Sequence, residues 1–183
     1  MTQRLRAAWG SISAQISSGR TASGVVRNSS ELLVVAAGTA WPFYRLTSAY
    51  VCQAGRSFRP TERIAFYSNK TIHGVAAVIQ SVFDHETLSE ASAARLSMSV
   101  APHERRMGNV MAAALAGPWK EGGASKVLLL SGPGDPDTLT FRPVTHRGAA
   151  AWTMGHRYTD LASLMSATST DDLSDQAVGR AYR

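Results

Sequence analysis

Aromatic rings that lie close to cationic side chains are the residues of this chain best suited to contact a ligand. We expect Trp41, Tyr67 and Trp152 to form walls on which a planar group could stack, and lysine or arginine residues follow several of the loop aromatics closely. A nucleobase stacks well on such rings, and Ser68 and Asn69 could supply hydrogen bonds to its edge. The alternative is that most of the rings belong to the core, because aromatic residues dominate small cores.

The positive charge is concentrated in the first part of the chain. The net charge is +6, and residues 1–80 carry nine Lys or Arg against two acids, whereas the remainder carries ten against eleven. Arginine binds phosphate through two parallel hydrogen bonds, so the excess suggests a polyanionic partner. An arginine-rich proteome would give the same excess. The residues that we expect to contact phosphate are Arg56, Arg59, Lys70, Arg142 and Arg147.

Catalytic and cofactor motifs are missing from the sequence. It contains no glycine-rich phosphate loop with its lysine, no G-x-G-x-x-G, no G-x-S-x-G and no H-E-x-x-H. Asp84, His85 and Glu86 are the one cluster of metal-ligand types, and as consecutive residues they cannot all point the same way, so we interpret them as a turn that caps a helix. Asp135 and Asp137 could mimic a nuclease metal site. We expect no metal and no cofactor. The first alternative is a metal-dependent nuclease or other nucleic-acid-processing enzyme of a defence system that uses these acids and His85.

The element that must position the candidate residues is the segment Thr61–Asp84. Its first half is aromatic and β-branched and predicts a strand, and Ser68-Asn69-Lys70 predicts a turn. The apolar run Ile72–Phe83 predicts the returning strand. Gly74 interrupts that run, which predicts a bulge or the close approach of another backbone.

The rest of the chain predicts further strands with helices between them and no strict alternation of the two. Trp41-Pro42-Phe43-Tyr44 cannot be a regular central strand because of its proline. We therefore expect an α+β fold built on a small, mostly antiparallel β-barrel with short helices and an N-terminal helix. The predicted strands are 31–37, 49–53, 126–130 and 138–144, the last two as a hairpin across a turn at 132–137, and the predicted helices are 86–95, 107–116 and a helix through Leu161 and Leu164 capped by Thr159 or Asp160.

Three regions are predicted along the chain. Residues 1–30 form a basic N-terminal helix and linker, 31–175 the barrel domain and 176–183 a frayed tail. The acid-free N-terminus has the composition of a transit peptide, although Cys52 as the single cysteine favours a reducing compartment. No apolar run reaches the 18 residues of a membrane helix, so we expect a cytoplasmic protein without a membrane partner.

The segment RIAFYSNKTIHGVAAVIQSVFD resembles part of the PUA-like barrel domains, especially the EVE and ASCH groups. This resemblance implies a five- or six-stranded barrel that binds RNA or modified DNA bases on its concave face, with Tyr67 and Ser68 at the edge of the pocket and Trp41 as an early tryptophan. The strand at 31–37 departs from the family because it contains no tryptophan, and the segment RYTDLASLMSATSTDDL (157–173) has no counterpart. The matching positions are Phe66, Tyr67, Ser68, Ile72, Gly74, Ala76 or Ala77, Val78 and Asp84.

Together these observations predict a domain that binds DNA or RNA and recognises a flipped or modified base in an aromatic-lined pocket. A third reading is a small-molecule sensor or a protein-interaction domain that uses the same pocket. In that case the charge of the basic loop Arg56–Arg63 could be reversed without affecting function.

Overall fold

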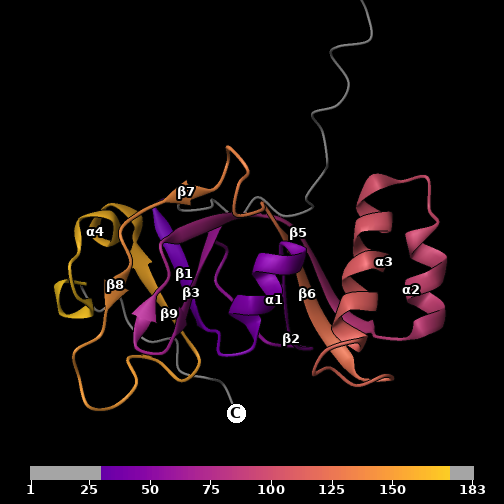
Figure 1. The fold of residues 1–183 in the computed structure, drawn as a ribbon, viewed down its shortest axis with the longest axis horizontal. Helices are drawn as coiled ribbons and strands as arrows, with labels where there is room; N and C mark the ends of the chain where they lie inside the picture. The colour runs from indigo at the N-terminus through magenta and orange to yellow at the C-terminus, as the bar shows by residue number, and fades with distance from the viewer. Residues whose placement is uncertain (1–29, 174–183) are drawn as a thin grey trace, which may run out of the picture.

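A mixed β-sheet forms the centre of the molecule in the computed structural model, which describes residues 30–173 (Figure 1). The hydrogen-bonded strands follow the order β2-β6-β5-β3-β1-β9. The expected N-terminal helix and the frayed tail lie outside the described residues. The strands of this path are β1 (Glu31–Ala36), β2 (Ala49–Gln53), β3 (Arg63–Ser68), β5 (Val75–Thr87), β6 (Ala124–Leu130) and β9 (His156–Asp160).

The sheet is mostly antiparallel but does not close. Only β1 and β3 pair in parallel, and within residues 30–173 no pairing joins β2 to β9 at the two ends of the path. The predicted α+β class and antiparallel pairing are therefore confirmed, while a closed barrel is not seen. Three two-residue strands lie off the path: β4 (Thr71–Ile72) pairs with β3 and β8, β7 (Leu139–Thr140) pairs with β5, and β8 (Val144–Thr145) pairs with β4.

The predicted turn and close approach within 61–84 are both present. Asn69 and Lys70 have φ angles of 49° and 58°, so the two central residues of the β3–β4 turn are left-handed, as a two-residue hairpin requires. Gly74 lies directly against the backbone of Phe141, and a Cβ at this position would collide with the Phe141 carbonyl oxygen. Only glycine fits here without a shift of one backbone.

The predicted hairpin between 126–130 and 138–144 is wrong. The predicted turn at 132–137 is present. Thr138, which follows it, is buried, and its hydroxyl donates to the Gly132 carbonyl at 2.6 Å. The chain after this turn does not pair with β6. β7 then pairs with β5, and β8 crosses to β4. Pro143, which has no N–H to give to a ladder, lies between the two short strands.

Residues 30–173 contain four α-helices, and their boundaries differ from those predicted. The run around Pro42 forms α1 (Ala40–Thr47), because proline is tolerated in the first turn of a helix. β5 continues to Thr87, so the helix predicted at 86–95 begins only at Glu90. The helix predicted from residue 107 begins earlier, at Pro102. The helices are α2 (Glu90–Ser97), α3 (Pro102–Leu115) and α4 (Leu161–Ser166), the last capped by Asp160 as predicted, and a 3-10 turn follows at Thr170–Asp172.

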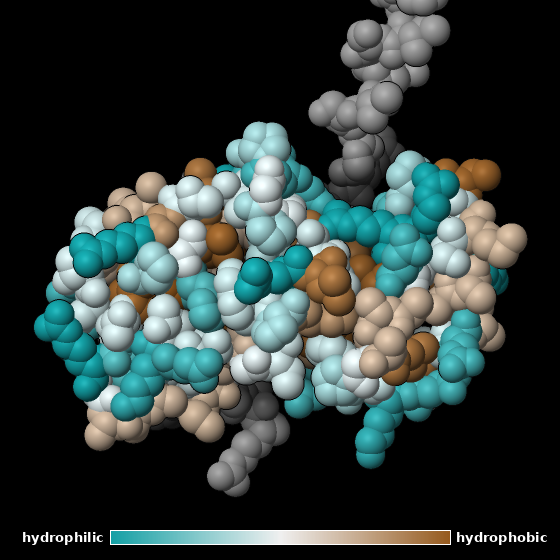
Figure 2. All heavy atoms as spheres, in the orientation of Figure 1, coloured by the Kyte–Doolittle hydropathy of each residue, from teal (hydrophilic) through white to brown (hydrophobic). Residues whose placement is uncertain are grey.

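The core consists of three clusters of buried side chains. The first lies on one face of the sheet under α1 and contains Phe66 and Tyr50. The second lies between the β2–β6 strands and the α2–α3 pair, which stands at one end of the molecule in Figure 1. The third contains Tyr67 and packs under β8 and α4 at the opposite end. The face seen in Figure 2 is mostly hydrophilic, and its hydrophobic residues are scattered.

Candidate functional site

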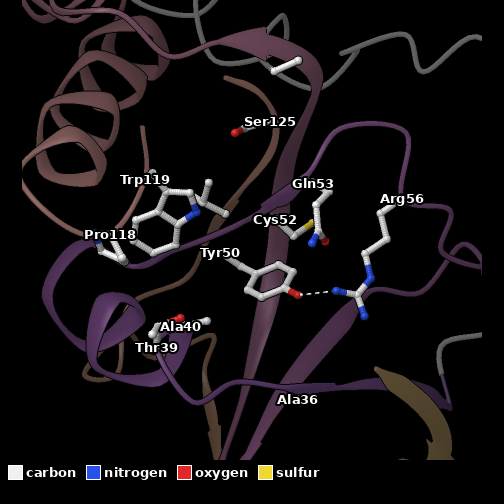
Figure 3. A pocket seen from close by; sticks show the side chains of 12 residues that line it. Ala36, Thr39, Ala40, Tyr50, Cys52, Gln53, Arg56, Pro118, Trp119 and Ser125 are labelled. Atoms are coloured by element: carbon white, nitrogen blue, oxygen red, sulfur yellow. Dashed lines mark hydrogen bonds between the residues drawn. The ribbon is translucent and has the colours of Figure 1, made fainter. Parts of the chain in front are cut away.

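A cavity of about 370 Å³ opens at the edge of β2, between the start of α1 and the connection from α3 to β6 (Figure 3). Tyr50 from β2 and Trp119 from the α3–β6 connection supply its aromatic rings. Its polar groups come from the N-cap of α1, the end of β2 and the loop that follows, namely Thr39, Gln53 and Arg56. A volume of this size lies within the usual range of small-molecule sites, about 300–1,000 Å³.

The alternation of β2 places Tyr50 and Cys52 on the same side of the strand. Burial raises the pKa of Tyr50, and the hydroxyl accepts a hydrogen bond from Arg56 Nη1 at 3.4 Å. Burial also raises the pKa of the Cys52 thiol to about 11. Both groups are therefore neutral at physiological pH, and Cys52 is not activated as a nucleophile.

Arg56 gives the cavity its positive charge. Its guanidinium lies 5.5 Å from the Phe58 ring and bonds to the neutral Tyr50 hydroxyl. Within residues 30–173 the ion pairs are Arg59 with Glu31 and Lys126 with Asp84, so no described carboxylate neutralises Arg56. An unpaired cation at the wall of a cavity favours an anionic group of a ligand.

Asp84 holds the loop that carries Arg56. Its carboxylate accepts from the Gly55 N–H at 3.0 Å and from Lys126 Nζ at 2.9 Å. These two donors lower the pKa of Asp84 to about 2. The predicted role of Asp84-His85-Glu86 as a helix cap is wrong, because β5 continues through all three residues and Asp84 fixes the neighbouring loop instead.

Trp119 and the first turn of α1 complete the cavity. The Trp119 ring packs on Phe43 with the centroids 4.6 Å apart, which ties the α3–β6 connection to α1. Thr39 is the N-cap of α1 but forms no side-chain cap bond, and no acidic residue occupies the first turn. The positive end of the helix dipole at this turn also favours negative charge.

Trp41 and Ser68 come together, but outside this cavity. The Trp41 ring stacks on His73 with centroids 4.1 Å apart and planes 3° apart, and His73 Nε2 lies 2.7 Å from Ser68 Oγ. Burial, with a smaller effect of Arg45, lowers the pKa of His73. One face of the Trp41 ring is therefore already covered by a neutral imidazole.

Tyr67 and Trp152 lie on the opposite face of the sheet. Tyr67 is 4% exposed, and its hydroxyl accepts from the main-chain N–H of Trp152 at 2.9 Å. Neighbouring residues of a strand point to opposite faces, so Tyr67 cannot share a pocket with Ser68 or with Trp41. The prediction of one pocket walled by Trp41, Tyr67 and Trp152 is corrected accordingly, and Asn69 is exposed in the β3–β4 turn.

Of the five predicted phosphate contacts, Arg56 alone lines this cavity. Arg59 lies 3.8 Å over the Tyr158 ring and borders a second cavity of about 510 Å³. Lys70 Nζ donates to the Gly148 carbonyl at 2.9 Å, while Arg142 and Arg147 are exposed near the β8 end of the molecule. These four cations could contact a nucleic acid only outside the cavity.

The acids proposed for a nuclease are dispersed. Asp135 accepts from the Asp137 N–H at 2.9 Å within the 132–137 turn, far along the chain from Asp84, His85 and Glu86. In the part of the chain that the structure describes, no group of three or more His, Cys, Asp or Glu side chains could hold a metal ion.

Sequence reasoning missed most of the residues that line the cavity. Trp119 lies between Gly117-Pro118 and Gly122-Gly123, and an aromatic residue in such a predicted loop was the one signal available. Tyr50 and Val51 belong to a short apolar strand that is typical of core. Thr39 could not be recognised because α1 was not predicted as a helix.

Comparison of the chain with family models, with curated proteins and with solved structures gave no match. Among the described residues, the helices are too short and too polar to span a lipid bilayer.

Proposed function

We propose that this chain binds a base of a nucleic acid in the cavity beside β2, with the half-buried Trp119 against the ring and Arg56, held by the buried Tyr50, on the adjacent phosphate. The observation that carries the proposal is the combination of the half-buried Trp119 ring with Arg56, which no described carboxylate neutralises, around one cavity of about 370 Å³. Rings suit the face of a base, and guanidinium suits phosphate.

The ligand is a single unstacked base of DNA or RNA rather than a duplex. A base inside a duplex is stacked on both faces, so contact of an aromatic side chain with its face requires a single strand or a base flipped out of the helix. A modified base is included in the proposal, since a cavity that receives an unstacked base can contact substituents that a groove-binding surface does not reach. The net charge of +6 supports the attraction of a polyanion.

We propose further that the sheet is curved in the manner of a PUA-like barrel. Ala36 of β1 and Tyr50 of β2 line the same cavity, although four strand spacings separate these strands along the hydrogen-bonded path. In a flat sheet that separation is about 19 Å. The curvature brings the two strands to either side of the cavity. A PUA-like domain of this kind would act in the cytoplasm.

Arg56 provides the test of the phosphate contact. Binding of fluorescent single-stranded DNA and RNA oligonucleotides, with and without modified bases, is measured by polarisation at several salt concentrations. We expect Arg56→Gln to weaken binding and to reduce the slope of log affinity against log salt by about 0.7. The control is Arg95→Gln, since Arg95 is exposed on α2 away from the cavity.

Two results would count against the proposal. One is the absence of binding by the wild-type protein at low salt. The other is equal effects of the two arginine substitutions, which would indicate a diffuse attraction by net charge and no defined contact.

A further inference from the structure

β2 has one edge that no described strand covers. Along the path of the sheet β2 pairs with β6, and it is the last strand on that side. The Leu130 N–H donates to the Ser48 carbonyl at 2.9 Å, which fixes the register of the ladder. Bonded pairs alternate along an antiparallel ladder, so Tyr50 and Cys52 bond to β6 and the main chain of Val51 points to the free edge.

The N–H and C=O of Val51 belong to a residue that is buried as a whole, and among the described residues no hydrogen bond joins them to a partner on that edge. Val51 is 4% exposed and lines the cavity. The next outward carbonyl, that of Gln53, already accepts from the Arg56 N–H. Buried main-chain groups are almost always paired, and an unpaired donor and acceptor side by side in a cavity wall indicate a ligand that pairs with both.

We infer that the main chain of Val51 reads the hydrogen-bonding edge of the base in the cavity. The inference rests on the proposed nucleobase site and specifies how the base is oriented there. The Val51 N–H donates to an acceptor of the base, and the Val51 carbonyl accepts from an adjacent N–H. The pairing edge of each common base presents such an adjacent donor and acceptor.

This orientation determines which modifications the site accepts. A methyl group that replaces the only hydrogen of the donor on the pairing edge leaves the Val51 carbonyl unpaired in a buried place, which is costly. A methyl group at C5 of a pyrimidine leaves both hydrogen bonds intact. The site therefore selects bases with a free pairing edge and tolerates substituents elsewhere on the ring.

An extended peptide could also pair with a strand edge, but the cavity favours a base. Addition of a strand uses several outward residues in succession. Ala49, the previous outward residue, does not line the cavity, and the carbonyl of Gln53 is occupied. One free donor–acceptor pair beside Tyr50 and Trp119 matches a single planar ring.

Isomeric nucleotides test the inference on the wild-type protein. Calorimetry first ranks the four nucleoside monophosphates, and the preferred base is then compared as two isomers that differ in the pairing edge. In each pair the first isomer has a blocked pairing edge and the second a free one. The pairs are 3-methyluridine and 5-methyluridine, 1-methylguanosine and 2′-O-methylguanosine, and, for cytidine and adenosine, the forms with an N,N-dimethyl and an N-ethyl amino group. We expect the blocked isomer to bind at least about tenfold more weakly.

Val51→Pro tests the same contact from the side of the protein. Proline removes the N–H, and an edge strand tolerates it where the N–H faces away from the ladder. We expect this variant to bind the base more weakly than Val51→Ala does. The alanine variant also lacks the valine methyl groups but retains the N–H, so it should still discriminate between the isomers. Thermal melting shows whether each variant is folded, and if Val51→Pro is not, the isomer comparison decides alone.

The outcomes separate this inference from the proposed function. If the wild-type protein binds nucleotides but does not distinguish the isomers, the reading by Val51 is overturned and the nucleobase site stands. Equal affinity of folded Val51→Pro and Val51→Ala also overturns it. If no nucleotide binds, or extended peptides bind in place of nucleotides, both proposals fail.

Discussion

At the scale of single residues, the site combines two neutral side chains, Tyr50 and Cys52, with the positively charged side chain of Arg56. Tyr50 and Cys52 are held neutral by burial, which raises the pKa of both groups, while Arg56 keeps its charge without a described carboxylate partner. Within residues 30–173 the Tyr50 hydroxyl is the one polar partner of the Arg56 guanidinium, and a phosphate group can readily replace it. Arg56 is therefore suited to exchange the Tyr50 hydroxyl for a phosphate group of a ligand.

His73 makes the stability of the molecule depend on pH. Its pKa in the folded protein lies below the ordinary value of 6.5. The stability gained from a neutral His73 is therefore complete above pH 6.5 and is lost as the pH falls from 6.5 to the folded pKa. We expect the urea midpoint to decrease across this range and His73→Gln to reduce the decrease.

The matched control for His73 is His103→Gln, because His103 is exposed on α3. A residual pH dependence should persist in His73→Gln, since burial and the charges of Arg56 and Arg59 also lower the pKa of His156. An unchanged pH profile in His73→Gln would show that the Trp41–His73 stack does not control the acid sensitivity.

At the scale of elements, the 54–62 loop links the cavity to the sheet through Asp84. Asp84→Asn keeps an acceptor for Gly55 but removes the charge that pairs with Lys126, which is 7% exposed. We expect weaker nucleotide binding because the loop no longer holds Arg56 in place. The depressed pKa of Asp84 contributes stability that is present above pH 3.8 and lost as the pH falls towards 2.

Urea unfolding at pH 6 and pH 3 measures the second effect of Asp84→Asn. The loss of stability of the wild-type protein between these pH values should become smaller in the variant. Asp137→Asn, an exposed change in a turn, is the control. Unchanged nucleotide affinity in Asp84→Asn would show that the loop keeps its position without this carboxylate.

Gly74 determines how closely the segment before β8 approaches the sheet. A methyl group at Gly74 would meet the Phe141 carbonyl, whereas a methyl group at Gly38 would have nothing within 4 Å. We expect Gly74→Ala to reduce the free energy of unfolding by about 1–3 kcal/mol, as other overpacking substitutions do. Gly38→Ala should leave it nearly unchanged. Equal denaturant midpoints for the two variants would contradict the observed approach.

At the scale of the whole molecule, local patterns predicted the elements better than their partners. The turn at Asn69-Lys70, the close approach at Gly74 and the cap at Asp160 follow from single residue types, and all three are present. The pairing of 138–144 could not be predicted, because it depends on β5 and β4 and not on the neighbouring β6. Strand β9 was missed since HRYTD has no apolar alternation.

The candidate site shows the same division. Arg56 was predicted from its type and its loop, and it lines the cavity. Trp41, Tyr67 and Trp152 were assigned to one pocket because each lies near a predicted loop with a Lys or Arg close by. Their distribution over two faces of the sheet follows from strand alternation and from the α1 helix, which the proline had concealed. Trp119 entered the site through the packing of α1 against the α3–β6 connection.

Trp119 provides the most direct measurement of the central claim that the cavity binds a base. Calorimetry of the preferred nucleoside monophosphate is compared between the wild-type protein, Trp119→Ala and Trp152→Ala, each checked for an unchanged fold by thermal melting. We expect at least about a fivefold loss of affinity in Trp119→Ala, because stacking on an aromatic ring contributes about 1–3 kcal/mol per base. Trp152→Ala should bind as the wild type does. Equal affinities of Trp119→Ala and the wild-type protein would contradict the claim.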